Sequence, residues 1–182
     1  MVLLVAVAGP AQTNLTARWF QLGAAAVDKE ANGTVRTVTS AMSVILLALD
    51  AGRTEGVPVD PKLAGRAIED LKDASSGFEA LAGRVSGHSI DVKTIETSGA
   101  LQQYYDLQAD LKKNGYSPPH DWKSYIQLLH DIVLKTADDL QALENNRNGT
   151  PAIEQRFLDL ISQKVLLEKI GALSGIITVA MQ

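Results

Sequence analysis

Three histidines and no cysteine leave few ligands for a metal ion in this chain. The histidines are His88, His120 and His130. Only His130 lies within an expected helix, and its neighbour Asp131 should fall on a different helix face, so no i, i+4 pair or Glu-x-x-His element forms. Because a metal site needs several converging ligands, we expect each histidine to have a surface or capping role, and we expect no metal and no cofactor.

Pairs of carboxylates are the second group that could do chemistry, as acid and base catalysts in a cleft. The pairs available are Asp138-Asp139, Glu69-Asp70 and Asp106 with Asp110. Each pair falls on the polar face of an expected helix, where a solvated charge is the ordinary outcome. The segment from Gly83 to Gly87 lacks the spacing and the Lys-Ser/Thr ending of a phosphate-binding loop. The sequence therefore predicts no catalytic residues and no enzyme.

A polar stripe on the first expected helix is the candidate for binding a small molecule. Its members recur every three or four positions, at Lys29, Asn32, Arg36, Thr39 and Ser43. If the stripe lines the interior of a bundle, Arg36, Thr39 and Ser43 are ligand-facing, with Arg36 pairing an anion. The alternative is that the stripe faces water, which is the more frequent place for such residues.

Two further segments are candidate surfaces for a protein partner. Tyrosine and tryptophan rings gather around residues 104–125, which suits recognition of a partner but equally suits packing of a helix end. The tail at residues 172–182 has no charged side chain, so it is either buried on every side or covered by a partner. The candidate partner-facing residues are Tyr116, Trp122, Tyr125, Ile176, Ile177 and Met181.

The first twelve residues, MVLLVAVAGPAQ, resemble the end of a signal peptide. Small residues at 6–8 and 9–11 suit cleavage by a signal peptidase, although no Lys or Arg precedes the apolar run. The alternative is a short apolar arm that packs on the body of the protein. We expect export, to the periplasm or cell envelope or as a secreted protein, with a cytoplasmic location as the alternative. The run is too short to span a bilayer.

Composition favours one helical domain, at residues 13–182. The chain has 182 residues, of which 46% are hydrophobic but only 5% aromatic, so the core must be built from Leu, Ile, Val and Ala. A formal net charge of -4 offers no basic face, and we expect no nucleic-acid partner. The absence of cysteine excludes thiol catalysis, zinc–thiolate sites, iron–sulfur clusters and disulfides.

Apolar residues at helical spacing predict five helices. The first should run over 14–51, with Gly33 as a kink or a break. The second should begin at Pro61 behind an Asp60 cap, and the third should cover 90–113. The fourth should start near residue 120, after the rigid turn YSPPHDW, and the fifth at Pro151. Short connections make consecutive helices antiparallel neighbours, so the predicted fold is an all-α, up-and-down bundle of four to five antiparallel helices in a single domain.

Three kinds of function fit this description. The leading one is a non-catalytic, exported helical bundle that works by binding a protein partner or by forming a homo-oligomer. The second is a sensor-like bundle that binds a small molecule. The third is a membrane-active or pore-forming protein, because the segments at 41–51 and 170–182 are apolar; each is below spanning length, and membrane contact is not the favoured interpretation.

Overall fold

The structure, a computed structural model, describes the backbone of residues 10–56, 59–85, 88–145 and 151–181, with side chains from residue 29 onward and, in the last range, from residue 154. Six helices lie in these ranges: α1 (Pro10–Glu55), α2 (Pro61–Ala82), α3 (Val92–Thr97), α4 (Leu101–Lys113), α5 (Trp122–Asn145) and α6 (Pro151–Val179). The only β-type pairing among the described residues is an isolated bridge between Ser89 and Asp121. The prediction of an all-α protein is confirmed.

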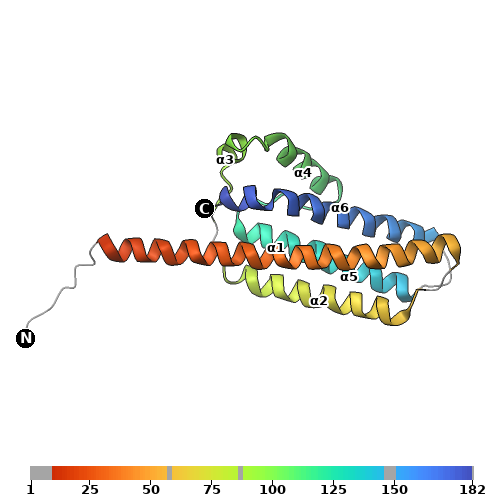
Figure 1. Cartoon of the computed structure of the whole chain (residues 1–182). Helices are drawn as coiled ribbons and strands as arrows, with labels where there is room; N and C mark the ends of the chain where they lie inside the picture. Colours follow the sequence, from red (N-terminus) through yellow and green to blue (C-terminus); the bar gives the residue numbers. More distant parts are fainter. Residues whose placement is uncertain (1–9, 57–58, 86–87, 146–150, 182) are drawn as a thin grey trace, which may run out of the picture.

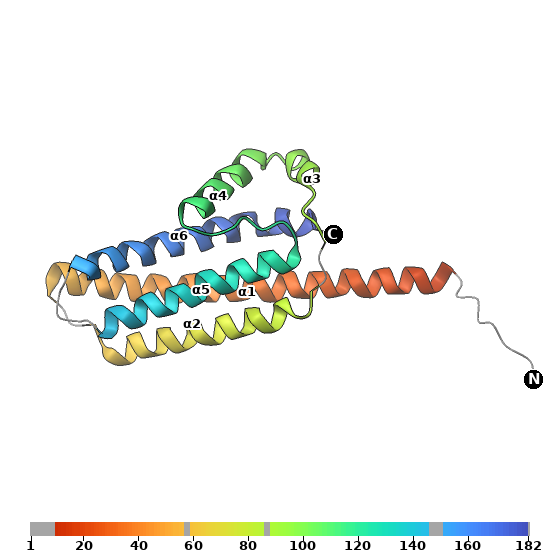
Figure 2. The same ribbon diagram turned by 180° about the vertical axis from the view of Figure 1, so that it is seen from behind.

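Four long helices form the bundle (Figure 1). In the order α1, α2, α5, α6 they make a closed ring in which each helix packs on the next and the last returns to the first. Adjacent helices in the ring run in opposite directions, which Figure 2 shows from behind. Helices α3 and α4 are an excursion between α2 and α5, and they pack on the outer side of α6. The predicted up-and-down bundle is therefore formed by four of the six helices.

Helix α1 passes through Gly33 without a break and ends four residues later than expected, at Glu55. A Cβ placed on Gly33 would meet nothing within 4 Å, so this glycine weakens the helix only through its backbone freedom, by about 1 kcal/mol. Packing of α1 against α2 and α6 outweighs that cost. The chain leaves the helical path at Gly56, whose φ of 69° lies in the left-handed region that glycine adopts readily.

The expected third helix is in fact two helices. The chain leaves the helical path at Gly99, which has a φ of 76°, and α4 starts at Leu101 in a new direction. Because of this bend, α4 packs on α6 and not on α5, the next long helix in the sequence. The expectation that all consecutive helices are neighbours is wrong at this point.

Three aspartates cap the starts of α2, α3 and α5. Asp60 accepts a hydrogen bond from the backbone N–H of Lys62 at 2.9 Å, as the sequence predicts. Before α3, the Thr94 hydroxyl and the Lys93 N–H donate to Asp91 and hold the pKa of its carboxyl below the usual value. Before α5, the backbone N–H and the hydroxyl of Ser124 both donate to Asp121 at 2.7 Å and likewise lower its pKa.

The core lies between the four long helices. The three- and four-residue spacing of apolar positions over residues 122–143 predicts a buried stripe on α5. All seven of its positions are buried: Trp122, Ile126, Leu129, Val133, Thr136, Leu140 and Leu143. Val35, Val38, Met42 and Ile45 of α1 are also buried. On α6 the same spacing predicts one apolar side, made of Ile153, Phe157, Leu160, Ile161, Leu167 and Ile170. Four of these are buried and Ile161 is exposed, while the side chain of Ile153 lies outside the described residues. The exposure of Ile161 is informative, because Leu158 and Val165 of the same helix are exposed apolar side chains as well.

Candidate functional site

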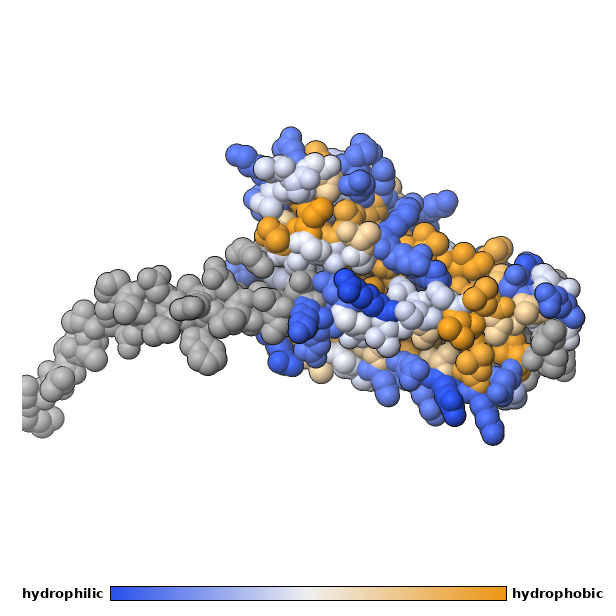
Figure 3. Space-filling model, in the orientation of Figure 1, coloured by the Kyte–Doolittle hydropathy of each residue, from blue (hydrophilic) through white to orange (hydrophobic). Residues whose placement is uncertain are grey.

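Helices α1 and α6 together expose a band of large apolar side chains. We call it the α1/α6 apolar face; its members are Val44, Leu47, Leu158, Ile161 and Val165. Leu47 is 72% exposed and Val44 is 54% exposed. In the space-filling view the hydrophobic colour gathers over these two helices, towards the end of the bundle where α1 finishes (Figure 3).

Contacts between the two helices place these residues at one height of the bundle. At one end, Arg53 of α1 pairs with Glu154 at 2.6 Å and lies over the Phe157 ring. At the other end, Gly171 of α6 lies against Val35. Because the helices run antiparallel between these two points, Leu47 is level with the stretch that holds Leu158 and Ile161. The exposed residues thus lie at one level along the bundle, and exposed apolar side chains of this kind mark interaction sites on soluble proteins.

The predicted ligand-facing residues lie beside a small cleft. Arg36 and Thr39 line a hollow of about 200 Å³ between α1 and α6, with Glu168 and Ser174 on the other wall. Ser43 is not part of it. The hydroxyls of Thr39 and Ser43 donate to the carbonyls of Val35 and Thr39 in their own helix. The cleft is smaller than the roughly 300–1,000 Å³ of ordinary ligand pockets.

A wider hollow of about 710 Å³ lies between α1 and α2. Its lining carries both positive and negative side chains, among them Lys29, Asp70 and Asp73. All three are exposed, so the hollow is an open surface depression without a dry, convergent set of polar groups.

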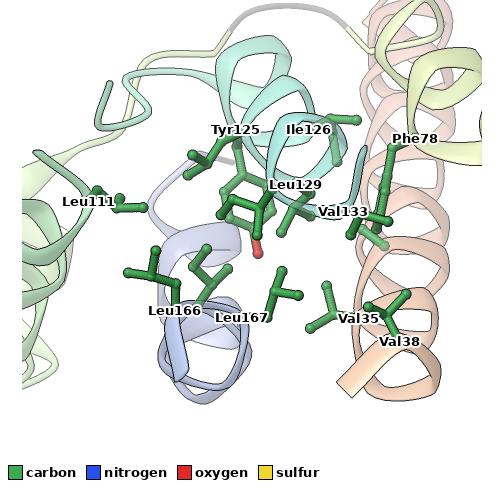
Figure 4. Close-up of a cluster of buried hydrophobic side chains, with 14 of the residues drawn as sticks. Val35, Val38, Phe78, Leu111, Tyr125, Ile126, Leu129, Val133, Leu166 and Leu167 are labelled. Carbon is green, nitrogen blue, oxygen red and sulfur yellow. The ribbon is translucent and has the colours of Figure 1, made fainter. Parts of the chain in front are cut away.

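Four of the six residues predicted to face a partner lie in the core of the chain. Trp122, Tyr125, Ile177 and Met181 are at most 3% exposed. Trp122 and Tyr125 stack edge to face, with ring centroids 6.1 Å apart, and Figure 4 shows Tyr125 among Leu129 and Leu167. Of the two alternatives for the aromatic group and the tail, packing within the bundle holds for these four residues. The prediction that they face a partner is corrected, because their side chains are buried among the helices. Tyr116 and Ile176 are half-buried against the core.

Asp139 is a buried carboxylate that the sequence placed on a polar face. It is 6% exposed and is surrounded by donors from α5 and α6. Lys135 donates to it at 2.6 Å, Gln163 at 2.7 Å and Arg156 at 3.2 Å. Its position among an aliphatic core on one side and two half-exposed cations on the other indicates a structural role, because a charge this deep must be paired.

The Tyr116 hydroxyl lies close enough to Asp139 for the charge of that carboxylate to shift the pKa of the phenol. Its oxygen is buried and makes no hydrogen bond to the described residues. Burial raises the pKa of Tyr116 to about 12, and the negative charges of Asp139, Asp131 and Asp159 add to the shift. The folded protein therefore holds this phenol in its neutral form.

Replacing Tyr116 by phenylalanine tests this arrangement. At pH 7 we expect Tyr116→Phe to be neutral, or to raise the free energy of unfolding by up to about 1 kcal/mol, because an unpaired buried hydroxyl is removed. The unfolded chain ionises this tyrosine near pH 10 and the folded chain near pH 12, so wild-type stability is lost progressively between these values. Urea unfolding from pH 8 to 12 should show the variant gaining on the wild type above pH 10. Tyr105→Phe, at an exposed position, is the matched control, and an equal gain there would contradict the assignment.

His88 and His120 lie on the two segments that the Ser89–Asp121 bridge joins, and His130 lies on α5. His88 and His120 are exposed. The His130 ring contacts Asp131 at 2.8 Å, although the two were expected on different helix faces; the flexible carboxylate reaches round the helix. In the described part of the chain, no three His, Asp or Glu side chains gather as they would around a metal ion.

One apolar helical segment among the described residues, Lys29–Glu55 of α1, is long enough to cross a membrane by length and composition. Core helices of soluble proteins pass the same test. Of the segment at 1–12 predicted as a signal, residues 1–9 lie outside the described residues, and Pro10 begins α1. The chain matches no family model, no curated protein and no solved structure.

Proposed function

We propose that this protein is a non-catalytic interaction protein that binds another protein surface through the α1/α6 apolar face. One observation carries the proposal: two adjacent helices expose large aliphatic side chains at the same height, where a soluble bundle would otherwise carry polar residues. The centres of protein interfaces are apolar in the same way. Export remains a prediction from residues 1–12 alone.

A photo-reactive amino acid at position 47 tests the proposal in the cells that make the protein. A benzophenone side chain in place of Leu47 should give a discrete covalent adduct with a protein, because a bound partner lies over the face. The same side chain in place of Val179, which is 56% exposed at the far end of α6, should not. Adding Leu158→Glu should abolish the adduct from position 47 while circular dichroism stays helical.

The outcomes separate the possible occupants of the face. An adduct that disappears with Leu158→Glu supports protein binding, and mass spectrometry of its peptides identifies the partner. No adduct, or the same adducts from positions 47 and 179, contradicts the proposal. So does binding to lipid vesicles that Leu47→Glu abolishes, because the face would then serve a membrane.

A further inference from the structure

The cleft between α1 and α6 contains most of the polar stripe of α1, which the proposed function does not use. Asn32, Arg36 and Thr39 of this stripe line it from α1, and Glu168 and Ser174 line it from α6. Large apolar side chains would fill such a seam between two packed helices. Small and polar side chains take their place here, so about 200 Å³ stays open.

The base of the cleft is apolar. Val35, Leu167 and Gly171 are the apolar members of its lining. A Cβ on Gly171 would lie 3.6 Å from the Cγ1 of Val35, so α6 approaches α1 closely at this point. Val35 and Leu167 are at most 2% exposed, whereas Arg36 and Glu168 are exposed. The cleft therefore has a dry base and a charged rim.

Apart from the Asn32 amide, the polar groups of the cleft divide into one donor and three acceptors. Arg36 offers only N–H donors, and it forms no ion pair in the described part of the chain. The hydroxyls of Thr39 and Ser174 already donate to backbone carbonyls of their own helices, at 3.0 and 2.8 Å, so their oxygens can serve a ligand as acceptors. Glu168 pairs with Lys164 at 2.5 Å and still has lone pairs to offer.

From this division we infer that the cleft binds a small zwitterion with a carboxylate and an ammonium group, the chemistry of a free α-amino acid. The carboxylate accepts from the guanidinium of Arg36, whose planar set of donors matches two oxygens. The ammonium has three N–H donors, which matches the acceptors of Thr39, Glu168 and Ser174. A ligand with only one charge would lie beside a like charge, either Arg36 or Glu168.

The volume of the cleft limits the size of the ligand. An apolar cavity of about 150 Å³ holds benzene. The cleft of about 200 Å³ therefore takes a ligand of roughly six to eight non-hydrogen atoms, which is the size of alanine or serine. The cleft shares no residue with the α1/α6 apolar face, so this inference does not rest on the function proposed above.

Titration of the isotope-labelled full chain with L-alanine, followed by NMR, tests the site. We expect saturable shifts of backbone amide signals within residues 32–39 and 167–174. Propionate and ethylamine each lack one charged group of L-alanine, so both should bind at least about fivefold more weakly. No saturation with L-alanine, saturable shifts only elsewhere on the bundle, or equal binding of propionate or ethylamine overturns the inference.

Arg36→Met tests the residue that holds the carboxylate. The substitution removes the charge and keeps an unbranched side chain, so the Kd for L-alanine should rise at least about fivefold. Arg66→Met is the matched control, because Arg66 is an exposed arginine on α2 that does not line the cleft. Circular dichroism should stay helical for both variants. Unchanged binding by Arg36→Met, or an equal loss in Arg66→Met, contradicts the assignment.

Gly171→Ala distinguishes a filled cleft from a weakened fold. The added methyl group makes an ordinary contact with Val35, and alanine is the better helix former, so the Tm without ligand should rise. The same methyl group takes up space in the cleft, so L-alanine should bind more weakly. Tight binding by this variant would contradict the location of the site. Leu47→Glu should bind L-alanine like the wild type, so the two proposals can fail separately.

Discussion

Leu129→Ala is expected to lower the free energy of unfolding by about 3 to 4 kcal/mol. Leu129 is fully buried near the middle of α5 and lies among side chains of the facing helices (Figure 4). Truncation removes its transfer free energy and leaves a cavity that the rigid helices cannot fill by collapsing. For a chain of this size the loss corresponds to a fall in Tm of about 6 to 15 °C.

Leu134→Ala is the matched control, because Leu134 lies on the same helix and is 38% exposed. The same atoms are removed there without a buried cavity, so we expect a loss below about 1 kcal/mol. Urea unfolding followed by circular dichroism measures both variants. Equal losses would mean that the interior of the bundle is not the one described.

Asp139→Ala is expected to lower the free energy of unfolding by about 2 to 3 kcal/mol. The substitution leaves the buried Gln163 amide without the carboxylate to which it donates at 2.7 Å. Lys135 and Arg156 lose their common partner but are partly exposed and recover hydration, which keeps the loss below that of a fully buried pair.

Asp138→Ala is the control that distinguishes the effect of losing the buried carboxylate of Asp139 from the effect of losing a surface charge. Asp138 is the exposed neighbour of Asp139, and its removal should change the free energy of unfolding by no more than about 0.5 kcal/mol. Asp139→Asn should lie between the two, because an amide still accepts from Gln163. If Asp139→Ala is as mild as Asp138→Ala, the carboxylate does not hold α5 and α6 together.

The sequence pattern predicts where the helices lie and which side of each is apolar. It predicts less well which other helices pack around each one. The α5 stripe is read correctly because regular spacing alone decides which side of a helix is apolar. The bend at Gly99 escapes the same reasoning, since apolar residues recur on both sides of it and only the backbone dihedral marks the turn. Asp139 is missed because its burial depends on Gln163, which is 24 positions away in the chain.

The sequence pattern does not predict the α1/α6 apolar face, for a related reason. Spacing on α1 accounts for Val38, Met42 and Ile45, but the number of helices that surround α1 decides whether Val44 and Leu47 are covered. The run SVILLAL does carry a signal, because consecutive apolar residues cover more of a helix's circumference than one stripe can bury. That signal indicates a surface and does not indicate its partner.

The closed ring of helices has a consequence for synthesis of the protein on the ribosome. Helix α1 is made first but packs most extensively on α6, which is made last. While α2 and α5 can pair as soon as both have emerged, the inward side of α1 with Val35 and Met42 stays open until translation is nearly complete. We therefore expect a chain that stops before α6 to leave part of this apolar side exposed, a state that favours aggregation.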